Sequence, residues 1–230
     1  MTDDSSGERR AITILRVSGG AVLLLSIVML AIFPAAPVER NVPGFVSPVV
    51  GFELASEPAH VFGILGQPDA PARAAAVRGM NLGNRIDFLF MVAYPALYVG
   101  IVLLLRARGR LTAGRARFVL VLPVVMWLGD LLENRELLAL AELTDPAAMT
   151  SGLARLRPFT IMKWYALFGT SALLAYPIWQ DRSWWRWSAV LFGVAAAVGF
   201  VSVTYLPAIE TAGYLLALAW LTTWVYSMRV

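Results

Sequence analysis

The chain has 230 residues, of which 59% are hydrophobic and 15% are charged, and its mean hydropathy is +0.68. A water-soluble domain of this length has too little interior to bury so many apolar side chains, so the composition predicts an integral membrane protein. The absence of cysteine excludes disulfides, thiolate catalysis and cysteine-bound metals, and the single histidine argues against a histidine-built metal or haem site.

The net charge of +4 comes mainly from arginines at the ends of apolar segments. The positive-inside rule of membrane proteins produces this placement. No basic stripe alternates with exposed aromatic residues, as it would in a nucleic-acid-binding surface. We therefore expect membrane lipids as partners, and no nucleic acid.

Continuous apolar runs of about 20 residues predict an all-α fold, a polytopic membrane helix bundle with six transmembrane helices and an outer-side helical loop. Residues 1–11 are expected to form a cytoplasmic tail, and residues 12–230 a single membrane domain. The predicted spans lie at about 12–33, 86–105, 118–138, 159–179, 187–206 and 212–227, with an outer cap loop at 34–85.

The loop at 34–85 contains two apolar segments that differ from the spans. Val49 to Leu65 is apolar on one side, but it is too short and too acidic to cross a bilayer. Residues 70–82 have the pattern of a small amphipathic helix, with Arg73 and Arg78 on its polar side. Both segments fit helices that lie at the membrane interface, and both fit a cap folded over the bundle.

Charged linkers then set the orientation of the predicted spans. Residues 106–117 carry five arginines and no acid. A second polar loop is predicted at 139–158, with a helix cap at 144–146. This layout places most basic residues, but few acids, on the side of the two termini. We therefore expect both termini in the cytoplasm and the chain in the inner (plasma) membrane.

The third span carries the feature around which the prediction of a site is built. Asp130, Glu133 and Asn134 stand at i, i+3 and i+4, so they share one face of a helix. A lone carboxyl group at the centre of a bilayer costs about 3 kcal/mol. Two of them on one stripe therefore need a shared proton, a cation, a basic partner or water, and Lys163 enters the next span from the same side.

Depth in the membrane predicts that these groups meet others in an outward-facing acidic pocket. The expected catalytic residues are Asp130, Glu133 and Lys163, and the expected substrate-binding residues are Asp87, Asn134, Asn84, Tyr94, Glu53 and His60. A structural alternative stands beside this one. Lys163 would then only pair with an acid to join two helices, and Asp87 would bond to Asn134. Solvation of these charges at the interface is the third alternative.

Three chemistries fit such a pocket. A shared proton suits acid–base work on a lipid or isoprenoid, and the same acids suit proton or cation transport. Asn84-x-x-Asp87 and Asp130-x-x-Glu133 are faintly similar to the acidic motifs of intramembrane prenyltransferases, which bind Mg²⁺ and diphosphate, but those motifs are longer and denser. The sequence itself requires no cofactor and predicts no metal site.

Four short motifs carry a resemblance over roughly residues 51–175: GFELA at 51–55, DFLF at 87–90, DLLEN at 130–134, and Lys163. In these the chain resembles a family of small bacterial multi-pass membrane proteins. No activity is established for that family, so the resemblance implies a membrane fold and no chemistry.

Taken together, the sequence favours binding or transformation of a lipid-like or isoprenoid substrate by acid–base chemistry. A proton- or cation-coupled transporter is the first alternative, and a non-catalytic membrane scaffold or accessory subunit is the second. Whether the protein is an enzyme stays open, as does assembly with a second copy or with a partner membrane protein.

Overall fold

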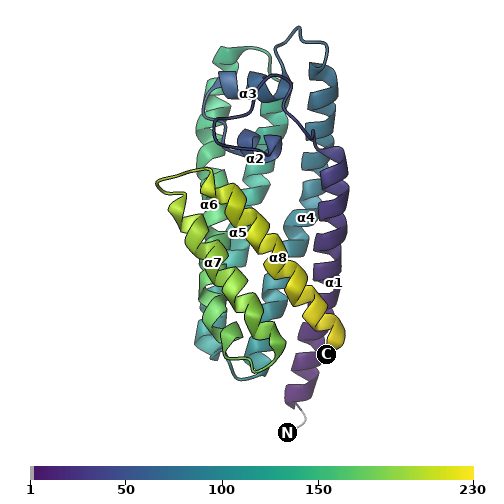
Figure 1. Cartoon of the computed structure of the whole chain (residues 1–230), viewed down its shortest axis with the longest axis vertical. Coiled ribbons are helices and arrows are strands. Elements are labelled where there is room, and N and C mark those ends of the chain that lie inside the picture. The colour runs from purple at the N-terminus through teal and green to yellow at the C-terminus, as the bar shows by residue number, and fades with distance from the viewer. Residues whose placement is uncertain (1–2) are drawn as a thin grey trace. The chain divides into compact units, whose positions relative to one another are not determined.

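The computed structural model describes residues 3–230, and its side chains from Ser6 onward. This part of the chain is helical and contains no β-strand, which confirms the all-α prediction (Figure 1). The helices are α1 (Asp3–Ile32), α2 (Pro48–Glu53), α3 (Pro58–Leu65), α4 (Arg73–Ala107), α5 (Ala113–Glu142), α6 (Pro146–Trp179), the 3₁₀ helix η1 (Trp184–Trp187), α7 (Ser188–Val201) and α8 (Ala208–Arg229).

Within the described residues, three helices are long and apolar enough to cross a membrane: the Ser6–Ile32 part of α1, α4 and α8. This is consistent with a membrane protein. The arrangement of six spans is not confirmed. Helix α7 has 14 residues, fewer than the roughly 20 that a span needs, and charged side chains interrupt the apolar runs of α5 and α6.

The segment at 70–82 differs from its prediction as a separate small helix. It forms the first turns of α4, which begins at Arg73 and continues without a break through the predicted span at 86–105. The polar residues here do not end the helix because they find partners on its side. Asn81, for example, donates a hydrogen bond to Glu142 at the end of α5.

The predicted loop at 139–158 is also mostly helical, since α6 begins at Pro146 and runs through Pro158. The predicted cap is present, because the Asp145 carboxylate accepts a hydrogen bond of 3.0 Å from the backbone N–H of Ala147. A lack of apolar residues was therefore a poor guide to the end of a helix here.

One of two compact units, the aromatic unit, comprises the residues up to Leu24, Val92–Trp127 and Trp164–Val230. Helices α7 and α8 pack together within it (Figure 1). Its core holds Tyr98, whose ring meets Trp220 edge-on at 6.2 Å and Phe192 at 5.9 Å. The Tyr98 hydroxyl is hydrogen-bonded to Ser171 at 2.7 Å, so this buried phenol is satisfied.

A charged node in the same unit is centred on Arg108, just beyond α4. Its guanidinium donates to Glu8 at 2.8 Å, to Asp181 at 2.8 Å and to the Tyr226 hydroxyl at 2.6 Å. Burial acts to raise the pKa of Asp181, but hydrogen bonds from Ser183 and the Arg108 guanidinium outweigh it and hold that pKa below its usual value. The node thereby fastens four segments that are distant in the sequence.

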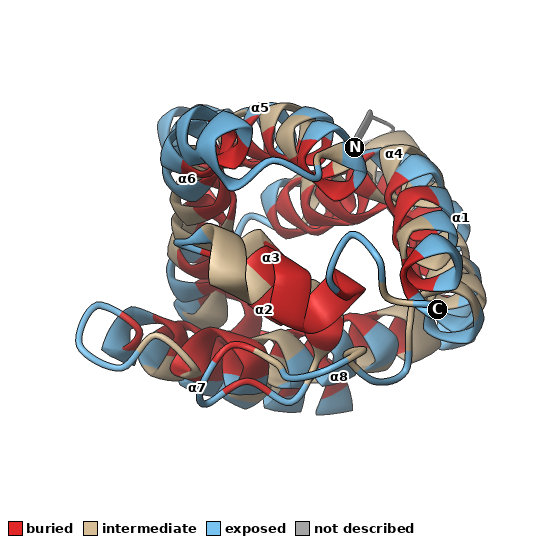
Figure 2. Ribbon diagram, turned by 90° about the horizontal axis from the view of Figure 1, so that it is seen from above, coloured by how far each residue is buried: buried red, intermediate tan, exposed pale blue. Residues whose placement is uncertain are grey.

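The second unit, here the polar unit, comprises Leu25–Met91 and Leu128–Lys163. It contains α2 and α3, the first part of α4, the second part of α5 and the first part of α6. Proline at the first position starts both short helices, and Gly66 ends α3 at a φ of +91°, a conformation that favours glycine. The buried residues of α2 and α3 are red in Figure 2.

Backbone hydrogen bonds hold α3 at its C-terminal half. Val38 donates to the carbonyl of Ile64 at 2.9 Å, and Glu39 and Arg40 donate to the carbonyl of Gly63. The buried guanidinium of Arg73 closes the arrangement, since it donates to the carbonyl of Gly66 at 2.6 Å and to those of Ala141 and Leu143 on the α5–α6 side.

Candidate functional site

Lys163 is the centre of a buried ionic cluster in the polar unit. Its ammonium pairs with Glu133 of α5, lies 3.2 Å from a carboxylate oxygen of Glu53 in α2, and lies 3.5 Å from one of Asp130 in α5. The Lys163 side chain is 11% exposed and that of Glu133 is fully buried. We call these four residues the Lys163 cluster.

The local sequence explains why the cluster can form. Asp130 and Glu133 are one helical turn apart and so point to the same side of α5. Gly129 precedes them, and a Cβ atom there would lie 2.8 Å from the backbone nitrogen of Lys163, closer than real contacts allow. The glycine therefore lets α5 and α6 approach closely, which brings the acids of α5 to the lysine of α6.

Thr160, one turn before Lys163, adds a hydroxyl that the sequence prediction missed. Its oxygen lies 2.7 Å from a carboxyl oxygen of Glu133, 3.0 Å from the carbonyl oxygen of Glu53 and 3.2 Å from that of Leu156. A hydroxyl has one hydrogen to donate. The three oxygens therefore compete for that hydrogen, and the shortest of the three contacts is the one that Thr160 donates to the Glu133 carboxylate.

Asn134 and Asp87 form a second polar contact beside the cluster. The amide of Asn134 donates to the Asp87 carboxylate at 2.6 Å. Asp87 is also close enough to interact electrostatically with Lys163, Asp130 and Glu53. One turn earlier on α4, the amide nitrogen of Asn84 is buried without a hydrogen-bond partner in the part of the chain that the structure describes.

The charge count of this site is unbalanced. Glu53, Asp87, Asp130 and Glu133 surround one lysine, so full ionisation would leave a net charge of −3 in a buried place. Carboxylates that share a site repel one another, and protons or cations must make up the difference. Among the described residues no group of three or more His, Asp or Glu side chains has a geometry that could hold a metal ion.

Two of the predicted residues contact other partners. His60 stays near the start of α3, where it contacts Glu57 at 3.3 Å and accepts from the Ser56 backbone N–H. Tyr94 belongs to the aromatic unit, and its ring stacks on Trp220 at 5.8 Å. Seven of the nine residues that the sequence singled out therefore belong to this site. Asn84 is included because it lies one helical turn before Asp87 on α4.

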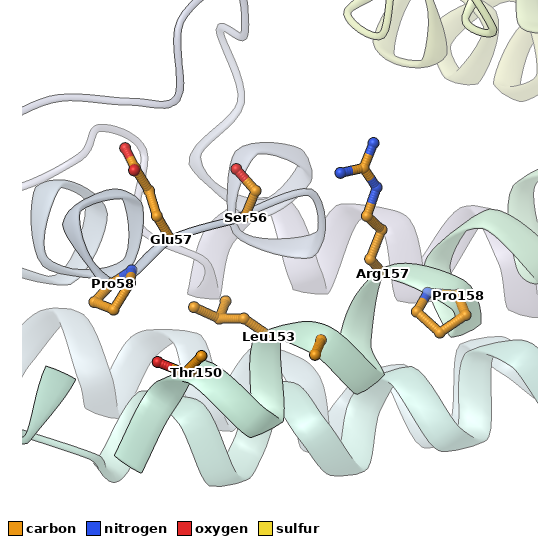
Figure 3. Close-up of a pocket in the computed structure, with 8 residues that line it drawn as sticks. Ser56, Glu57, Pro58, Thr150, Leu153, Arg157 and Pro158 are labelled. Atoms are coloured by element: carbon orange, nitrogen blue, oxygen red, sulfur yellow. The ribbon is translucent and has the colours of Figure 1, made fainter. Parts of the chain in front are cut away.

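A pocket of about 470 Å³ opens beside α6 in the same unit (Figure 3). One wall comes from Ser56 and Glu57, between α2 and α3, and from Pro58 at the start of α3. The other comes from Thr150, Leu153, Ala154, Arg157 and Pro158 on α6. None of the acids of the Lys163 cluster lines it. It lies about one helical turn along α6 from Thr160, and its first wall begins three residues after Glu53.

No protein family, no curated protein and no solved structure matches the chain at a significant level. The function is therefore inferred from the side chains of the Lys163 cluster and the residues around them.

Proposed function

We propose that the chain is an integral membrane protein whose Lys163 cluster holds and transfers protons, and that it binds a lipid-like molecule beside that cluster. Asp130 and Glu133 are the proton-handling groups and Lys163 is their electrostatic partner. Asp87 and Asn134 orient the bound molecule. A specific isoprenoid or phospholipid is the expected ligand, and acid–base chemistry is the expected reaction class.

The surplus of acids over bases carries this proposal. A purely structural ion pair needs one acid and one base, and a buried pair of this kind is at best a weak source of stability. Each further carboxyl group costs about 3 kcal/mol in a membrane interior. Acids that add cost without adding a pairing partner are typical of functional sites, where shared protons are part of the chemistry.

The proposed topology has six spans, with both termini in the cytoplasm of a cell whose inner membrane holds the protein. Three long apolar helices and the arginine-rich linker at 106–117 support it. The chain contains no cysteine, so single cysteines can be introduced without background. A cysteine at Gly109 should resist a membrane-impermeant maleimide in intact cells, and one at Asp69 should react with it; the opposite pattern would reverse the topology.

Native mass spectrometry with identification of co-purifying lipids tests the function. The wild-type protein should retain a specific lipid and Asp130→Asn should lose it while keeping its helical content. Glu136→Gln is the matched control on the same helix, because Glu136 forms an exposed pair with Arg155 outside the cluster. An Asp130→Asn protein that kept its lipid and was only less heat-stable would show a structural ion pair. Proton flux into liposomes, abolished by Glu133→Gln, would show transport instead.

A further inference from the structure

The pocket beside α6 has the dimensions and lining of a ligand site. Its volume of about 470 Å³ falls in the range of roughly 300–1,000 Å³ that small-molecule sites occupy. Leu153, Ala154 and the two prolines give it apolar walls, and the hydroxyls of Ser56 and Thr150 add two polar positions. Such a lining fits a molecule with an apolar part and a polar end.

The pocket carries one charge of each sign on its outer part. In Figure 3 the side chains of Glu57 and Arg157 both point away from Leu153, on either side of Ser56. Arg157 makes no ion pair or hydrogen bond to any described residue, although Arg155, two positions earlier, is paired with Glu136. An unpaired guanidinium beside a pocket is a ready partner for a phosphate.

The carboxylate of Glu57 is also accessible to a ligand. Its neighbour His60 accepts a hydrogen bond at Nδ1 from the backbone N–H of Ser56, so that nitrogen carries no proton. The proton of the neutral ring is then on Nε2, which lies 3.3 Å from the Glu57 carboxylate and donates to it. The imidazole thereby orients the carboxylate, and 61% of the Glu57 side chain remains exposed.

From this arrangement we infer that the pocket binds the headgroup of a zwitterionic phospholipid. The phosphate pairs with Arg157, the ammonium pairs with Glu57, and the glycerol end of the chains lies against Leu153 and the prolines. This inference rests on the proposed lipid binding and names the class of lipid, and it assigns the headgroup to a pocket that is separate from the Lys163 cluster. A purely anionic headgroup would meet the same arginine but would also meet the uncompensated Glu57 carboxylate, so the charge pattern favours the zwitterion.

The test uses the full-length protein in detergent with phosphatidylethanolamine or phosphatidylglycerol, and counts lipid adducts by native mass spectrometry. The wild-type protein should prefer phosphatidylethanolamine. Arg157→Gln should weaken binding of both lipids by about tenfold or more, which is the loss of one charge-assisted hydrogen bond. Glu57→Gln should weaken only phosphatidylethanolamine, and Arg155→Gln, with the same charge change two residues away, should leave both unchanged.

The outcomes separate this inference from the proposed function. Wild-type protein that retains neither lipid nor any other would contradict the proposed lipid binding itself. Specific lipid retention that Arg157→Gln leaves unchanged would overturn only the assignment of the pocket. Equal binding of the two lipids, unaffected by Glu57→Gln, would overturn the zwitterionic class. Free phosphoethanolamine that displaced the lipid at equal concentration would overturn the lipid as its source, since the apolar walls would then contribute nothing.

Discussion

Replacing Lys163 with methionine removes the only cation of the Lys163 cluster while keeping most of the volume of the side chain. At an effective dielectric constant of about 20, two opposite charges at the 3.2 Å separation of Lys163 and Glu53 attract each other by roughly 5 kcal/mol. The desolvation of the two charges offsets much of that attraction. Removing one member of a buried pair nevertheless costs about 3–5 kcal/mol, because the remaining charge is left uncompensated. We therefore expect Lys163→Met to lower the free energy of unfolding by about 3–5 kcal/mol at pH 8.

The same reasoning predicts the direction of the pH dependence. Lower pH protonates carboxyl groups in general, so the loss of unfolding free energy for Lys163→Met should be smaller at pH 5 than at pH 8. Reversible unfolding in mixed micelles, followed by the fluorescence of the eight tryptophans, measures both values. Arg155→Met removes an exposed cation and should cost less than about 1 kcal/mol. A loss for Lys163→Met that equalled this control, or that was the same at both pH values, would refute the reasoning.

Three further predictions follow from single contacts. Gly129→Ala should cost about 1–3 kcal/mol of unfolding free energy because its Cβ would meet the α6 backbone. Gly114→Ala on the same helix meets nothing and should be neutral or slightly stabilising. Equal effects of the two substitutions in thermal melts would contradict this prediction. Thr160→Val should cost about 1–3 kcal/mol by leaving Glu133 without its hydroxyl partner, and Thr160→Ser should restore the stability. Because the pKa of Asp181 is lowered in the folded protein, the ionised carboxylate stabilises the fold above the ordinary aspartate pKa, and this stabilisation is lost as the pH falls below that value. Asp181→Asn should therefore flatten the acid limb of a pH–stability curve. An unchanged limb would argue against the Arg108 node.

The sequence predicted the helical class and the meeting of charges well, for a physical reason. Ionisable side chains in an otherwise apolar chain need polar or oppositely charged partners, so Asp130, Glu133 and Lys163 could be expected to contact one another. The roles of these residues stay predictions. Thr160 was missed because a threonine in a helix carries no charge to mark it, and its spacing of three from Lys163 was the available signal.

Helix boundaries were less predictable than contacts. The starts of α4 and α6 are polar and were assigned to loops, because hydropathy measures only whether a residue prefers water. Both segments are helical because their polar groups are satisfied in place, by the pair of Asn81 with Glu142 and by the cap at Asp145. The contacts of His60 with Glu57 and of Tyr94 with Trp220 likewise depend on local partners that spacing alone does not show.

The fastening of α3 has a consequence for the rates of ligand exchange. The helix is held by three backbone hydrogen bonds from residues 38–40 and by the Arg73 guanidinium on the Gly66 carbonyl. Lifting it would break all of these together, and a hydrogen bond to a charged group alone is worth about 1.5–3 kcal/mol. We therefore expect a ligand of the pocket to exchange while α3 stays in place.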